Sequence, residues 1–269
     1  MSKKRIGVPD GADGWDSYAA FYDWENAQTV GRRDVAFWQG LARRTRGRVL
    51  ELGAGTGRLT LPLARVIGTR VIGIDRSAPM LARAVTKRRR LPVASRPTLF
   101  RGDIRALPFA SGSFQLVIAP YGMLQSLTRE TDLRRVLDEA ARVLRPGGML
   151  GVDLVPDLAI WDEYHREIRL RGRGPGGARV MLIESVRQDR RRKVTIFDQE
   201  FVETRDGART SKRFAVAFRT VPVPAMIMRL ERAGFDVAHM LGDYRGGRWD
   251  PRAEVWLLLA RLRRGRVRI

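Results

Sequence analysis

A glycine-rich turn between a strand-like and a helix-like segment is the feature that most constrains this chain. The sequence reads VLELGAGTGRLTL from Val49 to Leu61, with Gly53, Gly55 and Gly57 at alternate positions. The apolar run before the glycines predicts a buried strand, and the apolar spacing after them predicts a helix. Glycines at such a turn let a ligand approach bare backbone at the positive end of a helix. We therefore expect a ligand site here, with an ordinary tight turn of an α/β protein as the alternative.

The spacing of the glycines narrows the kind of ligand. The common dinucleotide-binding pattern is G-x-G-x-x-G, but Arg58 occupies its third glycine position here. A phosphate-binding P-loop is excluded because no Gly-Lys-Ser/Thr triplet follows the turn. The observed pattern is G-x-G-x-G, preceded by the acidic Glu51. The turn thus departs from both of these nucleotide-binding patterns.

The strand-like segments that follow also end in residues suited to ligand binding. RVIGIDRSAPML predicts a second strand that ends at Asp75, 18 residues after Gly57, about where an α/β fold places an acid for ribose hydroxyls. Asp103 follows a third short strand, and a fourth ends at Pro120 and Tyr121. A Pro-Gly-Gly turn then precedes a fifth strand in RVLRPGGMLGVDL. Ligands bind at the carboxyl ends of the strands in open parallel sheets, so we expect these loops to share one site.

Taken together, these segments resemble the class I S-adenosylmethionine-dependent methyltransferases, most closely the small-molecule N- and O-methyltransferases. ELGAGTG resembles their glycine-rich first motif, and LRPGG resembles the turn before their fifth strand. The sequence matches the family over residues 30–155, and a second, shorter match is the segment LERAGF near the end of the chain. The resemblance implies an α/β fold with a Rossmann-like seven-stranded methyltransferase sheet and helices on both faces.

The resemblance also implies a cofactor, S-adenosyl-L-methionine, whose demethylated product is S-adenosyl-L-homocysteine. Asp75 matches the acid that binds the ribose, and Asp103 with Ile104 matches the pair beside the adenine. The cofactor-binding residues implied by the resemblance are Tyr22, Arg33, Glu51, Gly53, Ala54, Gly55, Thr56, Gly57, Asp75, Arg76, Met80, Gly102, Asp103, Ile104, Pro120, Tyr121 and Gln125.

Aromatic residues crowd the segment from residue 15 to residue 24. They are Trp15, Tyr18, Phe21, Tyr22 and Trp24. One interpretation is a helix that packs its apolar face on the core. The other, implied by the resemblance, is a mobile lid over the cofactor, whose cationic sulfonium would be attracted to aromatic faces. The resemblance further matches Arg33 to an arginine that binds the cofactor's carboxylate, with a free surface arginine as the alternative.

The resemblance places the methyl acceptor beside the segment FQLVIAPYGMLQSL. The candidate substrate-binding residues are Tyr18, Tyr22, Tyr121 and Gln125. The candidate catalytic residues are Tyr121 and His165, and the competing interpretation of His165 is a solvent-facing position on a helix. No convincing general base emerges from the sequence, which favours an amine acceptor or catalysis by proximity.

After the fifth strand the chain changes to alternating apolar and polar residues. ARVMLIESVRQ, KVTIFDQEFVETRDG and TSKRFAVAFRTV predict an antiparallel meander of three strands. We expect one methyltransferase domain over residues 1–269. Its expected parts are an N-terminal helical lid (1–45), a cofactor-binding core (46–171), an antiparallel β insert (172–221), and a C-terminal helix with the last strands (222–269). The insert is a candidate to cover the acceptor or to form a homodimer.

Composition excludes several kinds of chemistry. The chain has no cysteine, so disulfides, zinc–thiolate sites and a thiolate nucleophile are excluded, and we expect no metal site. Lys and Arg number 51 against 29 Asp and Glu, a net charge of +22. This charge is typical either of a surface for nucleic acid or of an arginine-rich composition with a solvated surface. No signal peptide or membrane-spanning run is seen, so we expect a cytoplasmic protein without a membrane partner.

These observations predict methyl transfer from S-adenosyl-L-methionine to a nitrogen or oxygen of a small-molecule acceptor. The sequence APYG stands where exocyclic-amine nucleic-acid methyltransferases carry Asp/Asn-Pro-Pro-aromatic, which argues against that class. Two alternatives stay open. One is an RNA- or ribosome-associated methyltransferase of the same fold, and the other is a non-catalytic cofactor-binding or assembly protein.

Overall fold

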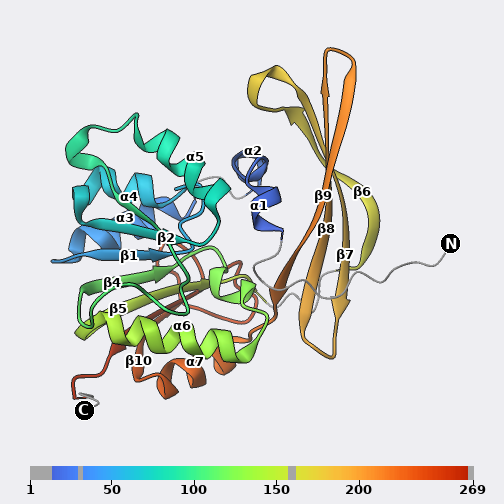
Figure 1. Cartoon of the computed structure of the whole chain (residues 1–269). Helices are drawn as coiled ribbons and strands as arrows, with labels where there is room; N and C mark the ends of the chain where they lie inside the picture. The colour runs from blue at the N-terminus through green and yellow to red at the C-terminus, as the bar shows by residue number, and fades with distance from the viewer. Residues whose placement is uncertain (1–13, 30–32, 157–161, 266–269) are drawn as a thin grey trace. The chain divides into compact units, whose positions relative to one another are not determined.

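The computed structural model of the chain describes residues 14–29, 33–156 and 162–265 (Figure 1). Contacts divide the chain into two compact units, which we call the large unit and the small unit. The large unit comprises Arg32–Leu124, Arg129–Pro156 and Val221–Ile269, and the small unit comprises Met1–Gly31, Gln125–Thr128 and Asp157–Thr220. No helix in these described ranges is long and apolar enough to cross a membrane.

A seven-stranded sheet forms the centre of the large unit, in the order β10-β11-β5-β4-β1-β2-β3. Strands β1 to β5 pair in parallel, whereas β11 runs antiparallel to both β5 and β10. The strands are β1 (Val49–Leu52), β2 (Val71–Asp75), β3 (Thr98–Arg101), β4 (Phe114–Ala119), β5 (Leu144–Leu154), β10 (Phe235–Leu241) and β11 (Trp256–Leu262).

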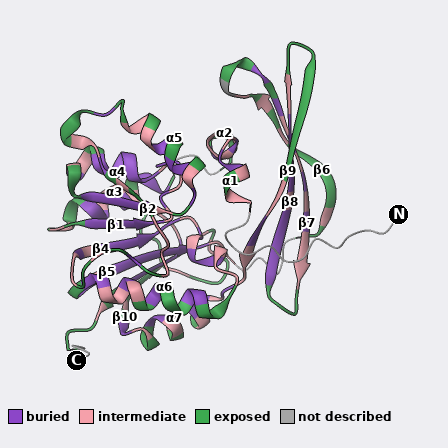
Figure 2. Ribbon diagram, in the orientation of Figure 1, coloured by how far each residue is buried: buried purple, intermediate pink, exposed green. Residues whose placement is uncertain are grey.

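Helices cover both faces of this sheet, with α3, α4 and α5 on one side and α6 and α7 on the other (Figure 1). The central strands are therefore buried on both faces, as Figure 2 shows, and β1 is buried at all of its positions. The helices are α3 (Val35–Arg44), α4 (Thr60–Ile67), α5 (Ala78–Arg88), α6 (Glu130–Val143) and α7 (Val223–Arg232), and short 3-10 turns lie at Gly68–Arg70, Val93–Ser95 and Met123–Ser126.

The core of the large unit joins α3 and α4 to the middle of the sheet. Trp38 of α3 is 1% exposed and packs in one cluster with Leu63 of α4, Leu116 of β4 and Leu259 of β11. Helix α3 therefore belongs to this core, although the sequence pattern placed it in an N-terminal lid over residues 1–45. Residues 1–13 and 30–32 of that expected lid lie outside the described residues.

The small unit contains a four-stranded antiparallel sheet, in the order β6-β7-β8-β9. Its strands are β6 (Tyr164–Arg173), β7 (Arg179–Asp189), β8 (Val194–Arg205) and β9 (Ala208–Arg219), with a 3-10 turn at Pro175–Gly177 between β6 and β7. Two short helices, α1 (Trp15–Tyr18) and α2 (Tyr22–Gln28), also belong to this unit.

The predicted fold class is confirmed: the large unit has the seven-stranded sheet, and an antiparallel β insert follows β5. The predicted insert of three strands from residue 172 was too short, because the structure adds the edge strand β6 from Tyr164. The helix suggested around His165 was also wrong. Strand β6 is mostly exposed and charged, as edge strands that avoid further pairing often are, so it lacks the apolar alternation that marks a strand.

A test of this packing uses two glycines that differ in their surroundings. A Cβ at Gly151 of β5 would lie 2.8 Å from Cζ3 of Trp38, whereas a Cβ at Gly40 of α3 would come no closer than 3.6 Å to its neighbours. We expect Gly151→Ala to lower the free energy of unfolding by about 1–3 kcal/mol, because the added methyl group would overpack the core. Gly40→Ala should raise it by about 0.5–1 kcal/mol, because alanine is favoured inside helices. Urea unfolding measures both, and a neutral Gly151→Ala would contradict the packing.

Candidate cofactor and acceptor site

The glycine turn between β1 and α4 has the backbone that its sequence predicts. Gly53, Gly55 and Gly57 have φ angles of 71°, 52° and 76°, a region that residues with side chains rarely adopt. The backbone N–H groups of Gly53 and Ala54 both donate to the carbonyl of Ile74, at 2.9 and 3.0 Å. A Cβ at Gly53 would lie 2.6 Å from Cγ of Met123, so glycine is required there by space as well as by φ. The turn is thus fixed against the end of β2.

Asp75, the last residue of β2, binds two backbone N–H groups through its side chain. Its Oδ2 accepts from Gly55 at 2.8 Å, and its Oδ1 accepts from Ser77 at 2.8 Å. Ser77 in turn caps α5, because its Oγ accepts from the N–H of Met80 at 3.3 Å. A carboxylate fixed at the end of a strand is a suitable acceptor for a vicinal pair of hydroxyls, as in ribose.

Glu51 lies behind the turn in a fully buried position. It is 3% exposed and accepts a hydrogen bond from the hydroxyl of Thr60 in the first turn of α4. Burial raises the pKa of Glu51 to about 8, so the side chain is largely protonated at neutral pH. Next to the turn, Gly73 of β2 has no space for a side chain, because a Cβ there would lie 2.8 Å from Cβ of Ala54. Glu51 therefore supports the turn from inside the unit.

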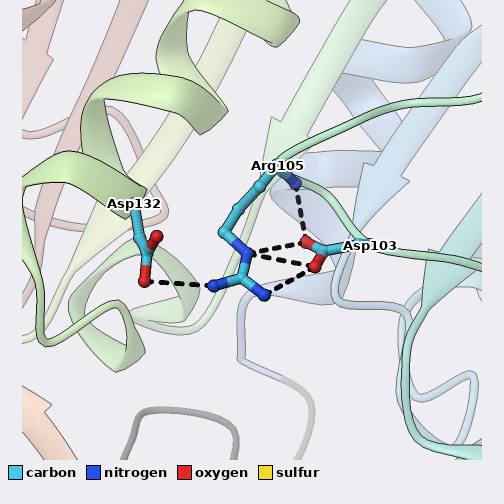
Figure 3. A network of polar contacts seen from close by, with 3 residues as sticks. All are labelled: Asp103, Arg105 and Asp132. Carbon is cyan, nitrogen blue, oxygen red and sulfur yellow. Dashed lines mark hydrogen bonds and ion pairs between the residues drawn. The ribbon is translucent and has the colours of Figure 1, made fainter.

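Asp103, in the loop after β3, is held by an arginine that the sequence analysis did not identify. Nε and Nη2 of Arg105 donate to the Asp103 carboxylate at 3.0 and 2.6 Å, and Nη1 reaches Oδ2 of Asp132 in α6 at 3.2 Å (Figure 3). The hydrogen bonds from Arg105 hold the pKa of Asp103 below its ordinary value. Asp103 is therefore an oriented anion beside the end of the sheet, and Arg105 connects it to α6.

Arg58 also proves to have a structural partner. Its two terminal nitrogens donate to the two carboxylate oxygens of Asp34, each at 2.7 Å, and the Asp34 side chain is 1% exposed. The Arg58 guanidinium carbon lies 5.1 Å from the centre of the Tyr121 ring, which is a cation–π arrangement. Tyr121 itself has a φ of 61°, unusual for a residue with a side chain. The ion pair thus contributes to positioning Tyr121 at the end of β4.

A second buried carboxylate supports the residue after Tyr121. Asp153 of β5 accepts from the N–H of Gly122 at 2.9 Å and from the hydroxyl of Tyr244 at 2.8 Å. Burial raises the pKa of Asp153 to about 6, and burial beside Asp153 raises the pKa of Tyr244. Sequence reasoning missed Asp153 and Tyr244, because their partners are far away in the chain.

The structure brings most of the proposed site residues together in the large unit, at the ends of β1 to β4. Met80 and Pro120 are buried, Arg33 and Arg76 are exposed, and Gly102 donates its N–H to the carbonyl of Asp75 at 2.9 Å. The proposed site residues in the large unit are Arg33, Glu51, Gly53, Ala54, Gly55, Thr56, Gly57, Asp75, Arg76, Met80, Gly102, Asp103, Ile104, Pro120 and Tyr121.

Four proposed residues belong to the small unit instead, namely Tyr18, Tyr22, Gln125 and His165. Tyr18 and Gln125 are buried, whereas His165 is exposed on β6, with its Nδ1 3.5 Å from the hydroxyl of Ser185. Phe21 stacks on Phe201 of β8 at 4.2 Å between ring centres, so part of the N-terminal aromatic group packs on the insert. The lid role of Tyr22 and the ligand-binding roles of these residues stay predictions.

A prediction follows from the buried Glu51. Its pKa in the folded chain, about 8, lies above the ordinary value of 4.5, so the folded state binds more protons between these two values. Glu51 therefore reduces stability as pH rises through this window, by about 1 kcal/mol per pH unit. Glu51→Gln removes this titration. Between pH 5 and pH 8, its free energy of unfolding in urea should therefore rise relative to that of the wild type by about 1 kcal/mol for each pH unit. Glu254→Gln, at an exposed position, should keep the slope of the wild type, and equal slopes for all three proteins would contradict the prediction.

Comparisons with known proteins agree with this geometry. Residues 49–148 match the family model described as a methyltransferase domain. The chain is 34% identical over 154 residues to the 2-phytyl-1,4-naphtoquinone methyltransferase of Synechococcus elongatus, a match that covers 54% of this chain and 64% of that relative. The chain thus spans less than two thirds of the length of this curated relative.

Solved structures match nearly the whole chain in fold. An S-adenosylmethionine-dependent methyltransferase from Clostridium acetobutylicum superposes with a TM-score of 0.75 at 16% identity, covering 92% of this chain and 99% of that chain. The sugar N-methyltransferase KedS8 from Streptoalloteichus gives a TM-score of 0.72 at 18% identity, covering 91% and 93%. Residues 49–148 therefore match a methyltransferase domain, and the chain has the fold of S-adenosylmethionine-dependent methyltransferases.

Proposed function

We propose that the chain transfers a methyl group from S-adenosyl-L-methionine to a nitrogen or oxygen of a small-molecule acceptor. The observation that carries this proposal is the convergence of the glycine turn, Asp75 and Asp103 at the ends of three adjacent strands, β1, β2 and β3. The match of residues 49–148 to a methyltransferase domain supports it. A dinucleotide is disfavoured because Arg58, bound to Asp34, stands where the third glycine of that pattern would be.

The residues present fit this cofactor. The turn from Gly53 to Gly57 offers a surface without side chains at three of its positions, and Asp75 presents oriented acceptors for the ribose hydroxyls. Asp103 presents a carboxylate for the exocyclic amine of adenine. When bound, the cofactor supplies an electrophilic methyl group with its own leaving group. The protein then has to bind and orient both molecules and to exclude water.

The described residues favour catalysis by positioning. His165 is exposed on an edge strand, so it gives no support for a histidine base. Tyr121 is fixed by its own backbone and by the Arg58 guanidinium over its ring, which suits a residue that orients an acceptor. An amine acceptor needs only to reach the methyl group in its neutral form. KedS8, which shares the fold, is titled a sugar N-methyltransferase, and this supports a nitrogen acceptor.

The net charge of +22 motivates an alternative, methylation of RNA. Several arginines of the large unit have structural partners, which weakens this alternative. Arg142 donates to the carbonyls of Phe109 and Leu107 at 2.6 and 2.9 Å, and Arg229 pairs with Glu130 at 2.8 Å. We keep a cytoplasmic small-molecule enzyme as the expectation, and a homodimer through the β insert as a further proposal.

The cofactor assignment predicts the effect of removing the ribose acceptor. Asp75→Ala should weaken binding of S-adenosyl-L-homocysteine by about ten- to a hundredfold, because hydrogen bonds to a charged group are lost. Asp75→Asn, which retains one acceptor oxygen, should lose less. Isothermal titration calorimetry measures both, with the exposed Asp250→Ala as the matched control. Binding of NAD by the wild type in place of the homocysteine product would contradict the assignment.

The acceptor assignment predicts a split between binding and turnover. Labelled S-adenosyl-L-methionine should transfer its methyl group to members of an amine and alcohol panel assayed beside bulk RNA. With the best acceptor, Tyr121→Phe should lower turnover by about tenfold, as expected when one positioning hydrogen bond is lost. Its affinity for S-adenosyl-L-homocysteine should stay within about twofold of the wild type. Labelling of RNA alone, falling steeply with salt, would replace the small-molecule assignment by the RNA alternative.

A further inference from the structure

One face of the antiparallel sheet in the small unit carries polar residues within an apolar layer. Glu184 of β7 pairs in register with Gln199 of β8, and side chains alternate between the two faces along each strand. Leu182, Phe197 and Phe201 therefore share this face with Glu184 and Gln199. Helices α1 and α2 pack on it, since Phe21 stacks on Phe201 and the Tyr18 ring lies 5.4 Å from that of Phe214 in β9.

The polar residues form two hydrogen-bonded groups, which we together call the carboxylate cluster: Tyr18 with Glu25, and Glu184 with Gln199 and Tyr164. Nε2 of Gln199 donates to Oε2 of Glu184 at 2.8 Å, and the Tyr164 hydroxyl donates to Oε1 of the same carboxylate. The Tyr18 hydroxyl donates to Oε2 of Glu25 in α2 at 2.6 Å. Glu184 and Gln199 are 7% and 5% exposed, whereas Glu25 and Tyr164 are only half-buried. The cluster therefore reaches the surface at its Glu25 and Tyr164 ends.

The cluster has more hydrogen-bond acceptors than donors. Oε1 of Gln199 has no donor among the described residues, although the atom is buried. Its amide is oriented by the bond to Glu184, so this oxygen is a fixed and unused acceptor. Burial, with a smaller contribution from the charge of Glu184, raises the pKa of Glu25 to about 7. Leaving buried acceptors unsatisfied is costly, so the cluster suits a ligand that brings donors.

The two carboxylates of the cluster have no ion-pair partner among the described residues, in a chain rich in arginine. In the described part of the chain, no Lys or Arg lies within ion-pair distance of Glu25 or Glu184. The opposite face of the sheet differs: Glu200, the next residue after Gln199, pairs with Arg166 at 2.9 Å and with Arg213 at 2.8 Å. Arg169 lies over the Tyr164 ring, but its ion pair is with Glu167. Among the residues that the structure describes, the two cluster carboxylates thus have no cationic partner.

We propose that the carboxylate cluster binds the protonated amine of a small molecule. An alkylammonium group offers up to three N–H donors and a positive charge, which suit the acceptor oxygens of Glu25, Glu184 and Gln199. The rings of Tyr18 and Tyr22, 5.3 Å apart at their centres, add faces that attract a cation. An alcohol offers one donor and no charge. Binding of an amine at this cluster goes beyond the proposed function and does not depend on it.

The test uses pairs of probes that differ only in the amine. Benzylamine is compared with benzyl alcohol, and D-glucosamine with D-glucose, by isothermal titration calorimetry at pH 7.5. We expect at least one amine to bind about ten- to a hundredfold more tightly than its neutral counterpart, and Glu184→Gln to abolish this preference. Glu25→Gln is a second variant for the case in which Glu184→Gln does not fold. Glu200→Gln, on the neighbouring strand β8 and on the opposite face of the sheet, should retain the preference of the wild type.

The outcomes separate this proposal from the proposed function. Equal binding of amine and neutral probes by the wild type would overturn the amine site, as would an unchanged preference in both Glu184→Gln and Glu25→Gln. An amine preference in the wild type that is lost in Glu184→Gln would support the amine site, whether or not any amine is methylated. Methyl transfer to alcohols alone, with no amine preference in binding, would retain the proposed function and overturn the amine site.

Discussion

Asp75 joins the loops that follow three adjacent strands of the large unit. Its side chain accepts from Gly55 in the loop after β1 and from Ser77 at the start of α5, both at 2.8 Å. Its backbone carbonyl accepts from Gly102 in the loop after β3 at 2.9 Å. These three loops carry the residues proposed to bind the cofactor, so the geometry of the site depends on one residue at the end of β2. The same carboxylate both builds the site and presents acceptors to the ligand.

Much of the proposed cofactor site was predictable from sequence, because the sequence patterns that mark it are local. The glycine pattern, the apolar strands and the acids at their ends lie within short stretches, and each requires a specific backbone or burial. The ion pair of Arg58 with Asp34 and the bond of Tyr244 to Asp153 could not be predicted in this way. Their partners are 24 and 91 residues apart, and nothing in the local pattern marks them. Strand β6 was missed for a related reason, because an exposed edge strand has no apolar period.

The charged side chains of the two units indicate how such a basic chain is organised. In the large unit, Arg58 and Arg105 each bind carboxylates and orient residues of the proposed site. Both arginines therefore have structural tasks, and the net charge by itself gives weak support for a nucleic-acid surface. The small unit provides the contrast, because Glu25 and Glu184 accept from tyrosine hydroxyls and form no ion pair with a described Lys or Arg. Carboxylates without an ion pair among the described residues suit a ligand with a positive charge.

The division into two units also explains which properties can be inferred from relatives. The methyltransferase domain match covers residues 49–148, which include β1 to β4 and all of the loops joined by Asp75. The small unit lies outside that match except for Gln125–Thr128. A cofactor site built largely from backbone and a few acids suits chains with different acceptors, whereas the acceptor is recognised by side chains. The naphthoquinone named for one relative therefore says little about the acceptor of this chain.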